Sequence, residues 1–218
     1  MDKIMKLITQ GNTAEIYEYS HNQVCKLFYP EYPKEYVEHE FHNAALVAKA
    51  GINTPKAYEI ITVQGRFGII YDRIIGTELT QSIYDESHRS KWLDRFAQFH
   101  KQLLQCRIDE LISYKDFLKI FAADPKTIMR IDSLPDDHYL LHGDFHLGNI
   151  MVVVSDHLIL LDMMNACKGP VLYDVARTYF LLSDSIRGQY LSRMGYTLES
   201  ITPYLDVISA IRENEIKR

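Results

Sequence analysis

The residues of this chain whose types and spacing suit catalysis lie between Leu140 and Ala176. The loop HGDFHLGN carries His142, Asp144 and Asn149 within eight residues, and Asp162 closes the apolar runs that follow. Carboxylate and amide oxygens are the ligands that Mg²⁺ prefers, and a carboxylate can also accept a proton. The pattern predicts a site for metal binding and proton transfer. The alternative is a loop whose polar side chains only satisfy its own backbone.

The runs IMVVV and LILLD predict a β-hairpin that turns at SDH, residues 155–157. If Val154 faces Leu158, antiparallel pairing places Ile150 opposite Asp162. Because opposed Cα atoms lie about 4.5–5.5 Å apart, we expect Asn149 to lie beside Asp162, where both could bind one Mg²⁺.

A histidine, an aspartate two residues later, an asparagine five residues after it and an aspartate beyond a hairpin are the catalytic layout of kinases. The segment HGDFHLGNI…LLDMMNACKGPVLYDVA resembles the aminoglycoside phosphotransferase and choline kinase-like family, which has glycine after the histidine and neither DFG nor APE. The resemblance implies that Asp144 is the catalytic residue and that Asn149 and Asp162 bind magnesium. His142 and Asp174 would support the loop.

A zinc site built from His142, Asp144 and His146 is the competing chemistry, because alternate residues of a strand share one face. Two glycines in HGDFHLGN favour a loop instead, and no fourth ligand is evident.

The resemblance also assigns residues of the N-terminal part to nucleotide binding. Lys26, in the apolar run QVCKLFY, would contact the α- and β-phosphates and pair with a glutamate of the next helix. Periodicity does not choose between Glu38 and Glu40, which flank the expected apolar stripe; the family's spacing to the following proline, Pro55 here, favours Glu40.

Two further nucleotide-binding segments follow from the same resemblance. The turn at Gly11, Asn12 and Thr13 would cover the phosphates, although it has one glycine where protein kinases have GxGxxG. Asp72 and Ile74, in the expected hinge, would bind adenine through their backbone groups. A Walker A sequence is absent, which excludes a P-loop NTPase.

The order of expected elements predicts an α+β, protein-kinase-like bilobal fold. Short β-prone runs and one helix over KEYVEHEFHNAALVAKAG predict a β-rich nucleotide-binding lobe, residues 1–76, with a hinge at about 71–76. The apolar face Leu93, Phe96, His100, Leu103 and Leu104 predicts a helix in the second lobe, residues 77–218. We interpret His100 as a structural residue of that core.

Composition excludes several classes of function. The 218 residues carry a net charge of −5, which argues against a nucleic-acid partner. No apolar run is long enough to span a membrane, and three widely spaced cysteines without a CxxC predict a reducing, cytoplasmic location.

We therefore expect an enzyme that uses ATP and Mg²⁺ to phosphorylate a hydroxyl of a small molecule. The resemblance suggests an aminoglycoside or another cationic amino alcohol as acceptor. A protein kinase and a catalytically silent nucleotide-binding protein are the alternatives.

Overall fold

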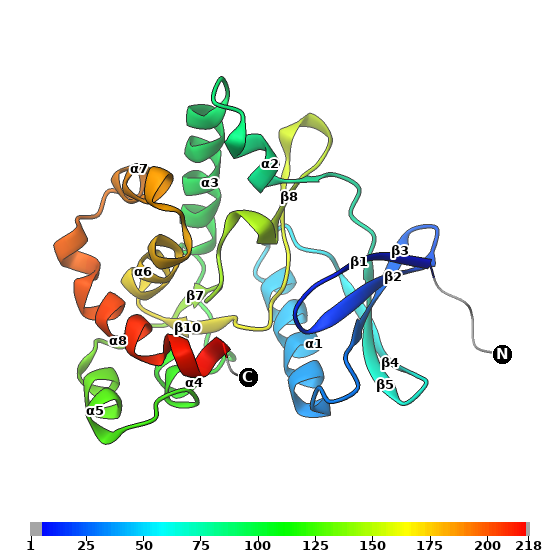
Figure 1. The fold of residues 1–218 in the computed structure, drawn as a ribbon, viewed down its shortest axis with the longest axis horizontal. Helices are drawn as coiled ribbons and strands as arrows, with labels where there is room; N and C mark the ends of the chain where they lie inside the picture. The colour runs from blue at the N-terminus through cyan, green and yellow to red at the C-terminus, as the bar shows by residue number, and fades with distance from the viewer. Residues whose placement is uncertain (1–5, 217–218) are drawn as a thin grey trace. The chain divides into compact units, whose positions relative to one another are not determined.

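The computed structural model describes residues 6–216, which divide into two compact units (Figure 1). The first unit contains residues 6–77 and Met151–Met164, and the second contains Glu78–Ile150 and residues 165–216. The sequence predicted a single division between residues 76 and 77 and assigned the 151–164 segment to the second lobe. In the structure that segment is part of the first unit.

A five-stranded antiparallel sheet forms most of the first unit, with the order β1-β2-β3-β5-β4. Its strands are Lys6–Gln10 (β1), Ala14–Ser20 (β2), Gln23–Phe28 (β3), Ala57–Val63 (β4) and Arg66–Asp72 (β5). Residues 4 and 5 of the first expected run lie outside the described residues. Side chains of a strand alternate between the two faces, so Cys25 packs with Ile70 on one face while Phe28 packs with Val37 and Ile69 on the other. Lys26 shares the face of Phe28.

Helix α1 (Lys34–Lys49) packs on β4 and β5 (Figure 1). It begins after Pro33, and Gly51 follows its end with a φ of +85°, a left-handed conformation that glycine adopts without strain. Its buried positions include Val37, Glu40, Ala44 and Val47, whereas Ala48 is exposed. Glu40 therefore lies on the buried stripe itself.

A small sheet of order β6-β8-β9 joins Thr77–Glu78 (β6), Ile150–Val152 (β8) and Leu158–Leu160 (β9). Val153 N donates to His157 O at 2.9 Å, so the hairpin closes one residue earlier on each strand than the expected pair of Val154 and Leu158. A Cβ at Gly76 would lie 2.3 Å from Val152 O, which explains a glycine at this point of close backbone approach.

The second unit is mainly helical. Its helices are Leu79–Tyr84 (α2), Arg89–Leu103 (α3), Tyr114–Lys119 (α4), Pro125–Ser133 (α5), Val171–Leu181 (α6), Asp184–Met194 (α7) and Leu198–Ile216 (α8). Helix α6 packs against α7 and α8, and α3 packs against α2 and α7 (Figure 1). None of the helices in the described part of the chain has the length and apolar character needed to cross a bilayer.

The expected face of α3 is confirmed, because Leu93, Phe96, His100, Leu103 and Leu104 are all buried. Asp124 caps helix α5, and Pro125 is the first residue of this helix. A proline is well tolerated at the first helical position, since its missing N–H would be unpaired there anyway.

Candidate active site

Lys26 of β3 forms an ion pair with Glu40 of α1. Its Nζ donates to both carboxylate oxygens of Glu40 at 2.8 Å, while Glu38 pairs instead with Lys34 at the surface. Lys26 Nζ also lies 3.3 Å from Asp162 Oδ1. Burial alone would lower the pKa of the Lys26 ammonium, but Asp162 and Glu40 outweigh it and raise the pKa above its ordinary value, so Lys26 is charged.

Two further side chains hold this cluster. Tyr71 of β5 donates its hydroxyl to Glu40 Oε1 at 2.9 Å, and Asn43 of α1 donates to Met163 O at 3.0 Å. Burial raises the pKa of the Glu40 carboxyl, against the opposing effect of Lys26. Helix α1 thus carries Glu40, and through the Asn43 hydrogen bond it also holds the backbone at Met163, next to Asp162. The sequence analysis identified neither Tyr71 nor Asn43.

Asp162 has a left-handed backbone, with a φ of +62°. Non-glycine residues adopt this region rarely, and Asp and Asn do so more easily than most. Its Oδ1 accepts a hydrogen bond from Met164 N at 3.3 Å and faces Lys26, while Oδ2 has no partner within residues 6–216. The side chain is 39% exposed, so one carboxylate oxygen is open to a ligand.

In the second unit, Asp174 of α6 holds the backbone of the HGD loop. The N–H groups of His142 and Gly143 donate to its two carboxylate oxygens, both at 2.8 Å. Burial would raise the pKa of the Asp174 carboxyl, but the hydrogen bonds from His100 and His142 N lower it, so this fully buried carboxylate is ionised. Gly143 has a φ of +73°, and a Cβ there would lie 2.4 Å from Asn165 O.

His100 of α3 extends this clamp, as a buried residue of the core. Its Nε2 lies 3.1 Å from Asp174 Oδ2, and its Nδ1 lies 2.7 Å from the Tyr190 hydroxyl. Burial lowers the pKa of His100 despite the nearby carboxylate. A neutral ring then donates from Nε2 to Asp174 and accepts from Tyr190 through Nδ1, which confirms a structural role for His100.

Asp144 is surrounded by donors and positive charge. Asn149 Nδ2 lies 3.3 Å from Asp144 Oδ2, His146 Nε2 lies 3.5 Å from the same atom, and Arg177 Nη2 lies 4.0 Å from Oδ1. Burial would raise the pKa of the Asp144 carboxyl, but His146, Arg177 and His142 together lower it. The loop therefore presents an ionised carboxylate whose side chain is 28% exposed.

Arg177 was not identified from the sequence, although a signal for it exists. Its Nε donates to Gly143 O at 3.1 Å, and its side chain is 3% exposed. Arg177 lies three residues after Asp174, so both side chains share one face of α6. A charged pair at that spacing inside LYDVARTYFLL indicates a polar contact in the core.

Asn149 in the second unit and Asp162 in the first each have a side-chain oxygen of a chemistry that suits magnesium. Asn149 Nδ2 donates to Asp144 O at 3.0 Å, which leaves Asn149 Oδ1 without a partner among the described residues. It is a hard oxygen ligand of the kind Mg²⁺ selects, and so, in the first unit, is the free Oδ2 of Asp162.

The zinc alternative finds no support in the structure. His142 is buried, and its Nδ1 accepts a hydrogen bond from Asp144 N at 3.2 Å. Between residues 6 and 216, no group of three or more His, Cys, Asp or Glu side chains is arranged to hold a metal ion.

The Gly11–Thr13 turn connects β1 and β2. Gly11 N donates to Ala14 O at 2.9 Å, and Tyr29 N donates to Thr13 O at 3.1 Å. The N–H groups of Asn12 and Thr13 have no acceptor in the part of the chain that the structure describes. Gly11 has no positive φ, so its backbone conformation does not itself require a glycine.

The expected hinge residues differ in their contacts. The Asp72 carboxylate accepts hydrogen bonds from Lys56 N at 2.9 Å and from the Tyr58 hydroxyl at 2.7 Å, so this side chain ties β5 to β4. Arg73 N donates to Asn22 O at 2.9 Å. The backbone groups of Ile74 have no partner within residues 6–216 and are open to a ligand.

Comparison with known proteins places this geometry in context. Residues 113–204 match the model of the phosphotransferase enzyme family. Aminoglycoside phosphotransferase APH(3'')-Id from Streptomyces rimosus, solved with ADP and streptomycin, is 13% identical; the match has a TM-score of 0.66 and covers 97% of this chain and 94% of that one. The APH(2'')-IIa complex with streptomycin and ATP is 15% identical at a TM-score of 0.64, covering 99% and 88%.

A putative fructosamine-3-kinase from Haemophilus somnus has the same fold. It is 15% identical at a TM-score of 0.63, covering 98% of this chain and 86% of that chain. No curated protein matches the sequence. The resemblance noted in the HGD segment is thereby confirmed: the chain has the α+β, protein-kinase-like fold of the aminoglycoside phosphotransferases, and residues 113–204 carry the sequence features of the phosphotransferase enzyme family.

Proposed function

We propose that this protein is an ATP-dependent phosphotransferase that moves the γ-phosphoryl group of ATP to a hydroxyl of a small molecule. The observation that carries the proposal is the ionised Asp144 carboxylate, held by Asn149, His146 and Arg177 on a loop that Asp174 clamps. A loop fixed in this way can orient a hydroxyl group for in-line attack, which is the main requirement of phosphoryl transfer.

Lys26 contacts the α- and β-phosphates in this proposal. Its ammonium is charged, and Glu40 fixes its position from the buried side. The turn at Gly11, Asn12 and Thr13 offers free N–H groups to the phosphates, and Ile74 offers free backbone groups to the adenine. Asp72 contributes through its backbone, because its side chain is engaged with Lys56 and Tyr58.

Asp144 orients the acceptor hydroxyl and takes its proton. The new bond joins the acceptor oxygen to the γ-phosphorus, the bond from that phosphorus to the β-phosphate oxygen breaks, and ADP leaves. A carboxylate with a lowered pKa is a weak base, so we assign the proton transfer to a late stage, when the acceptor oxygen has become acidic. His142 and Asp174 hold the loop and transfer no proton.

Asn149 and Asp162 are the residues proposed to bind magnesium, through Asn149 Oδ1 and the carboxylate of Asp162. Bound magnesium would neutralise charge on the phosphates. Lys26 and Met164 N occupy only Oδ1 of Asp162, so both can keep their contacts while Oδ2 binds a cation.

Aminoglycosides and other amino alcohols are candidate acceptors from the fold relationship. The cytoplasmic location expected from the cysteines also stays a prediction. Cys25, Cys106 and Cys167 form no disulfide within the described residues.

The test is acceptor-dependent release of ADP from Mg-ATP by the wild type and by Asp144→Asn. General acid–base groups typically contribute about 10²–10⁴-fold to a rate, and we expect a loss in that range. Asp206→Asn is the matched control, because Asp206 is exposed on α8. ATP binding without turnover of any acceptor would favour a silent nucleotide-binding protein, and phosphorylation of generic protein substrates would favour a protein kinase.

A further inference from the structure

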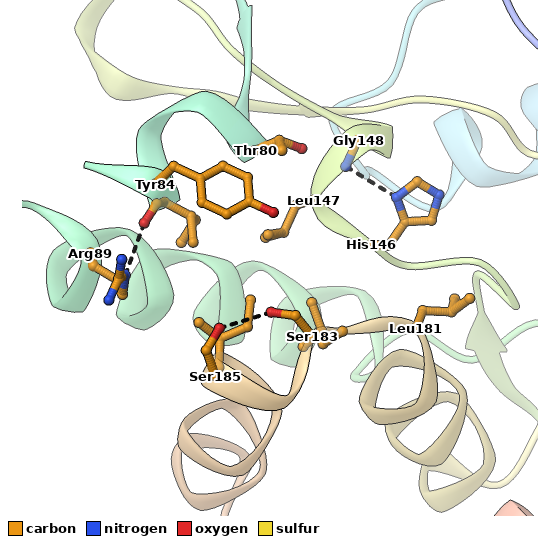
Figure 2. Close-up of a pocket in the computed structure, with 12 residues that line it drawn as sticks. Thr80, Tyr84, Arg89, His146, Leu147, Gly148, Leu181, Ser183 and Ser185 are labelled. Atoms are coloured by element: carbon orange, nitrogen blue, oxygen red, sulfur yellow. Dashed lines mark hydrogen bonds between the residues drawn. The ribbon is translucent and has the colours of Figure 1, made fainter. Parts of the chain in front are cut away.

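A pocket of about 470 Å³ lies within the second unit, beside the catalytic loop (Figure 2). Helix α2, the first residue of α3, the loop residues His146–Gly148 and the α6–α7 connection line it. Its volume lies in the range of small-molecule binding sites, about 300–1,000 Å³. None of the residues assigned above to nucleotide binding lines this pocket.

The basic side chains of the lining are those of Arg89, whose guanidinium carries the charge, and of His146. Arg89 and His146 line the pocket from opposite ends of the view in Figure 2, and no carboxylate is among the lining residues. Arg89 donates from Nε to Ile83 O at 3.1 Å, while its Nη2 meets Glu86 only at 3.5 Å. Glu86 is 86% exposed, so it offsets little of the guanidinium charge within the pocket. A polycation would meet like charge here and no carboxylate partner.

The remaining lining combines hydroxyl groups with apolar surface. Thr80, Tyr84, Ser183 and Ser185 supply hydroxyls, and the Ser183 and Ser185 oxygens lie 3.0 Å apart. Figure 2 shows the Tyr84 ring extending along the pocket, and this side chain is 70% exposed. Hydroxyl groups can donate or accept hydrogen bonds, so these side chains can bind the hydroxyls of a polyol. The exposed aromatic ring can pack against the C–H groups of the same molecule.

His146, which lines the pocket, also lies next to Asp144. Gly148 N donates to His146 Nδ1 at 3.1 Å, so a neutral ring carries its proton on Nε2, 3.5 Å from Asp144 Oδ2. A ligand that touches His146 in the pocket therefore lies next to the side chain proposed to orient the acceptor hydroxyl.

We propose that this pocket binds the acceptor and that the acceptor is a polyol without positive charge, with any carboxylate or phosphate substituent directed to Arg89. This inference rests on the proposed phosphotransferase function. It differs from the expectation of a cationic acceptor, because the lining provides hydroxyl, aromatic and basic groups and no counter-ion for an amine.

The test combines a charge series of acceptors with a variant that fills the pocket. D-glucose, myo-inositol and D-gluconate are compared with ethanolamine, choline and streptomycin, by ADP release and by saturation-transfer NMR without nucleotide. Thr80→Trp places an indole in the pocket. Gln81→Trp is the control, since it puts the same side chain on an exposed position of α2 outside the lining.

We expect at least one uncharged or anionic polyol to be phosphorylated, with KM at least tenfold higher in Thr80→Trp and unchanged in Gln81→Trp. Turnover of the cationic compounds alone, absence of both turnover and NMR contact for every polyol, or equal behaviour of the two tryptophan variants would overturn the inference. Polyol contact that Thr80→Trp abolishes, without any ADP release, would support the ligand class while counting against the phosphotransferase. Unchanged nucleotide-induced stabilisation in both variants shows that the fold is intact.

Discussion

At the scale of single residues, Glu40 and Glu38 allow a buried ion pair to be compared with a surface ion pair on the same helix. Glu40 is 1% exposed and bonds Lys26 and Tyr71, whereas Glu38 is 50% exposed and bonds Lys34 one turn away. Removal of one partner from a buried pair costs about 3–5 kcal/mol. An exposed i,i+4 pair contributes about 0.3–0.5 kcal/mol.

We predict that Glu40→Gln lowers the free energy of unfolding by about 3 kcal/mol, the lower end of that range, because Lys26 keeps its contact with Asp162. The KM for ATP should rise about tenfold, equivalent to about 1.4 kcal/mol of lost binding. Denaturant unfolding and steady-state kinetics measure both effects. Similar losses in Glu38→Gln would contradict the assignment.

His146 is predicted to hold Asp144 in its ionised state. His146→Asn keeps an acceptor for Gly148 N, as an Asx residue can, but removes the Nε2–H that faces Asp144. Since His146 lowers the pKa of the Asp144 carboxyl, its loss should raise that pKa. The acidic limb of kcat/KM against pH should then move to higher pH.

His146→Gln is the conservative control, because its amide can return a donor to Asp144 and should restore most of the profile. An acidic limb that stays in place in His146→Asn would show that Arg177 and His142 set the ionisation of Asp144 without His146. The measurement is independent of the acceptor's identity, provided that one acceptor is turned over.

The catalytic loop could be predicted from residue spacing, whereas its supports could only partly be predicted. His142, Asp144, Asn149 and Asp162 lie close together in sequence, within one recognisable pattern. Glu40 could be chosen as the partner of Lys26 only from the family's spacing. Glu40 lies on the buried face of α1, and a search for apolar residues at helical spacing does not find a glutamate there. Contacts such as that of Asn43 with Met163, 120 residues apart, leave no local signal.

At the scale of elements, the main sheet and helices α1 and α3 followed from their sequence patterns. The short β-prone runs predicted a β-rich lobe. Its main sheet has five strands, and the Gln64-Gly65 turn, where both residues have positive φ, joins β4 to β5. Helices α2, α5 and α7 were missed. Helix α2 has only six residues, too few for a helical period to repeat, and α7 contains Gly188, which weakens the helical signal.

At the scale of elements, we predict that alanine has opposite effects on the free energy of unfolding at Gly143 and at Gly188. Gly143→Ala must place a Cβ 2.4 Å from Asn165 O at a positive φ, so we expect a loss of about 2 kcal/mol or more and a strong loss of turnover. Gly188 lies exposed within α7 with open space around a Cβ. Gly188→Ala should therefore stabilise the protein by about 0.5–1 kcal/mol.

Denaturant unfolding of both variants checks the signs, and the ADP-release assay checks activity. A Gly143→Ala variant with wild-type activity would show that the loop relaxes without moving Asp144. Destabilisation by Gly188→Ala would mean that α7 makes a contact that the structure does not show.

At the scale of the whole molecule, each unit is built from two separate segments of the chain. The hairpin that ends at Asp162 belongs to the first unit, and the chain then returns to the second unit, where α6 lies. Lys26, Glu40 and Asp162 therefore share one unit, although 136 residues separate Lys26 from Asp162 in the chain. Asp144, Asn149 and Asp174 share the other. A change confined to one cluster should thus alter nucleotide binding and acceptor turnover to different extents.

Nucleotide binding should therefore be visible as a change in stability, without any acceptor. A ligand at 100 times its Kd stabilises the folded state by about 2.7 kcal/mol, and we predict an increment of this size from Mg-ATP that EDTA largely removes. Asp162→Asn should lose the magnesium-dependent part. Its unliganded stability should fall only through the weakened contact with Lys26, because asparagine tolerates the left-handed backbone of Asp162 as aspartate does. Asn149→Ala should also lose the magnesium-dependent part, with a lower unliganded stability because its hydrogen bond to Asp144 O is lost. Asp206→Asn should match the wild type. Thermal unfolding with ATP, with Mg-ATP and with Mg-ATP plus excess EDTA measures the increments. A magnesium-dependent increment in Asp162→Asn equal to that of the wild type would show that Asp162 does not bind magnesium, since no other change in that variant compensates for the lost charge.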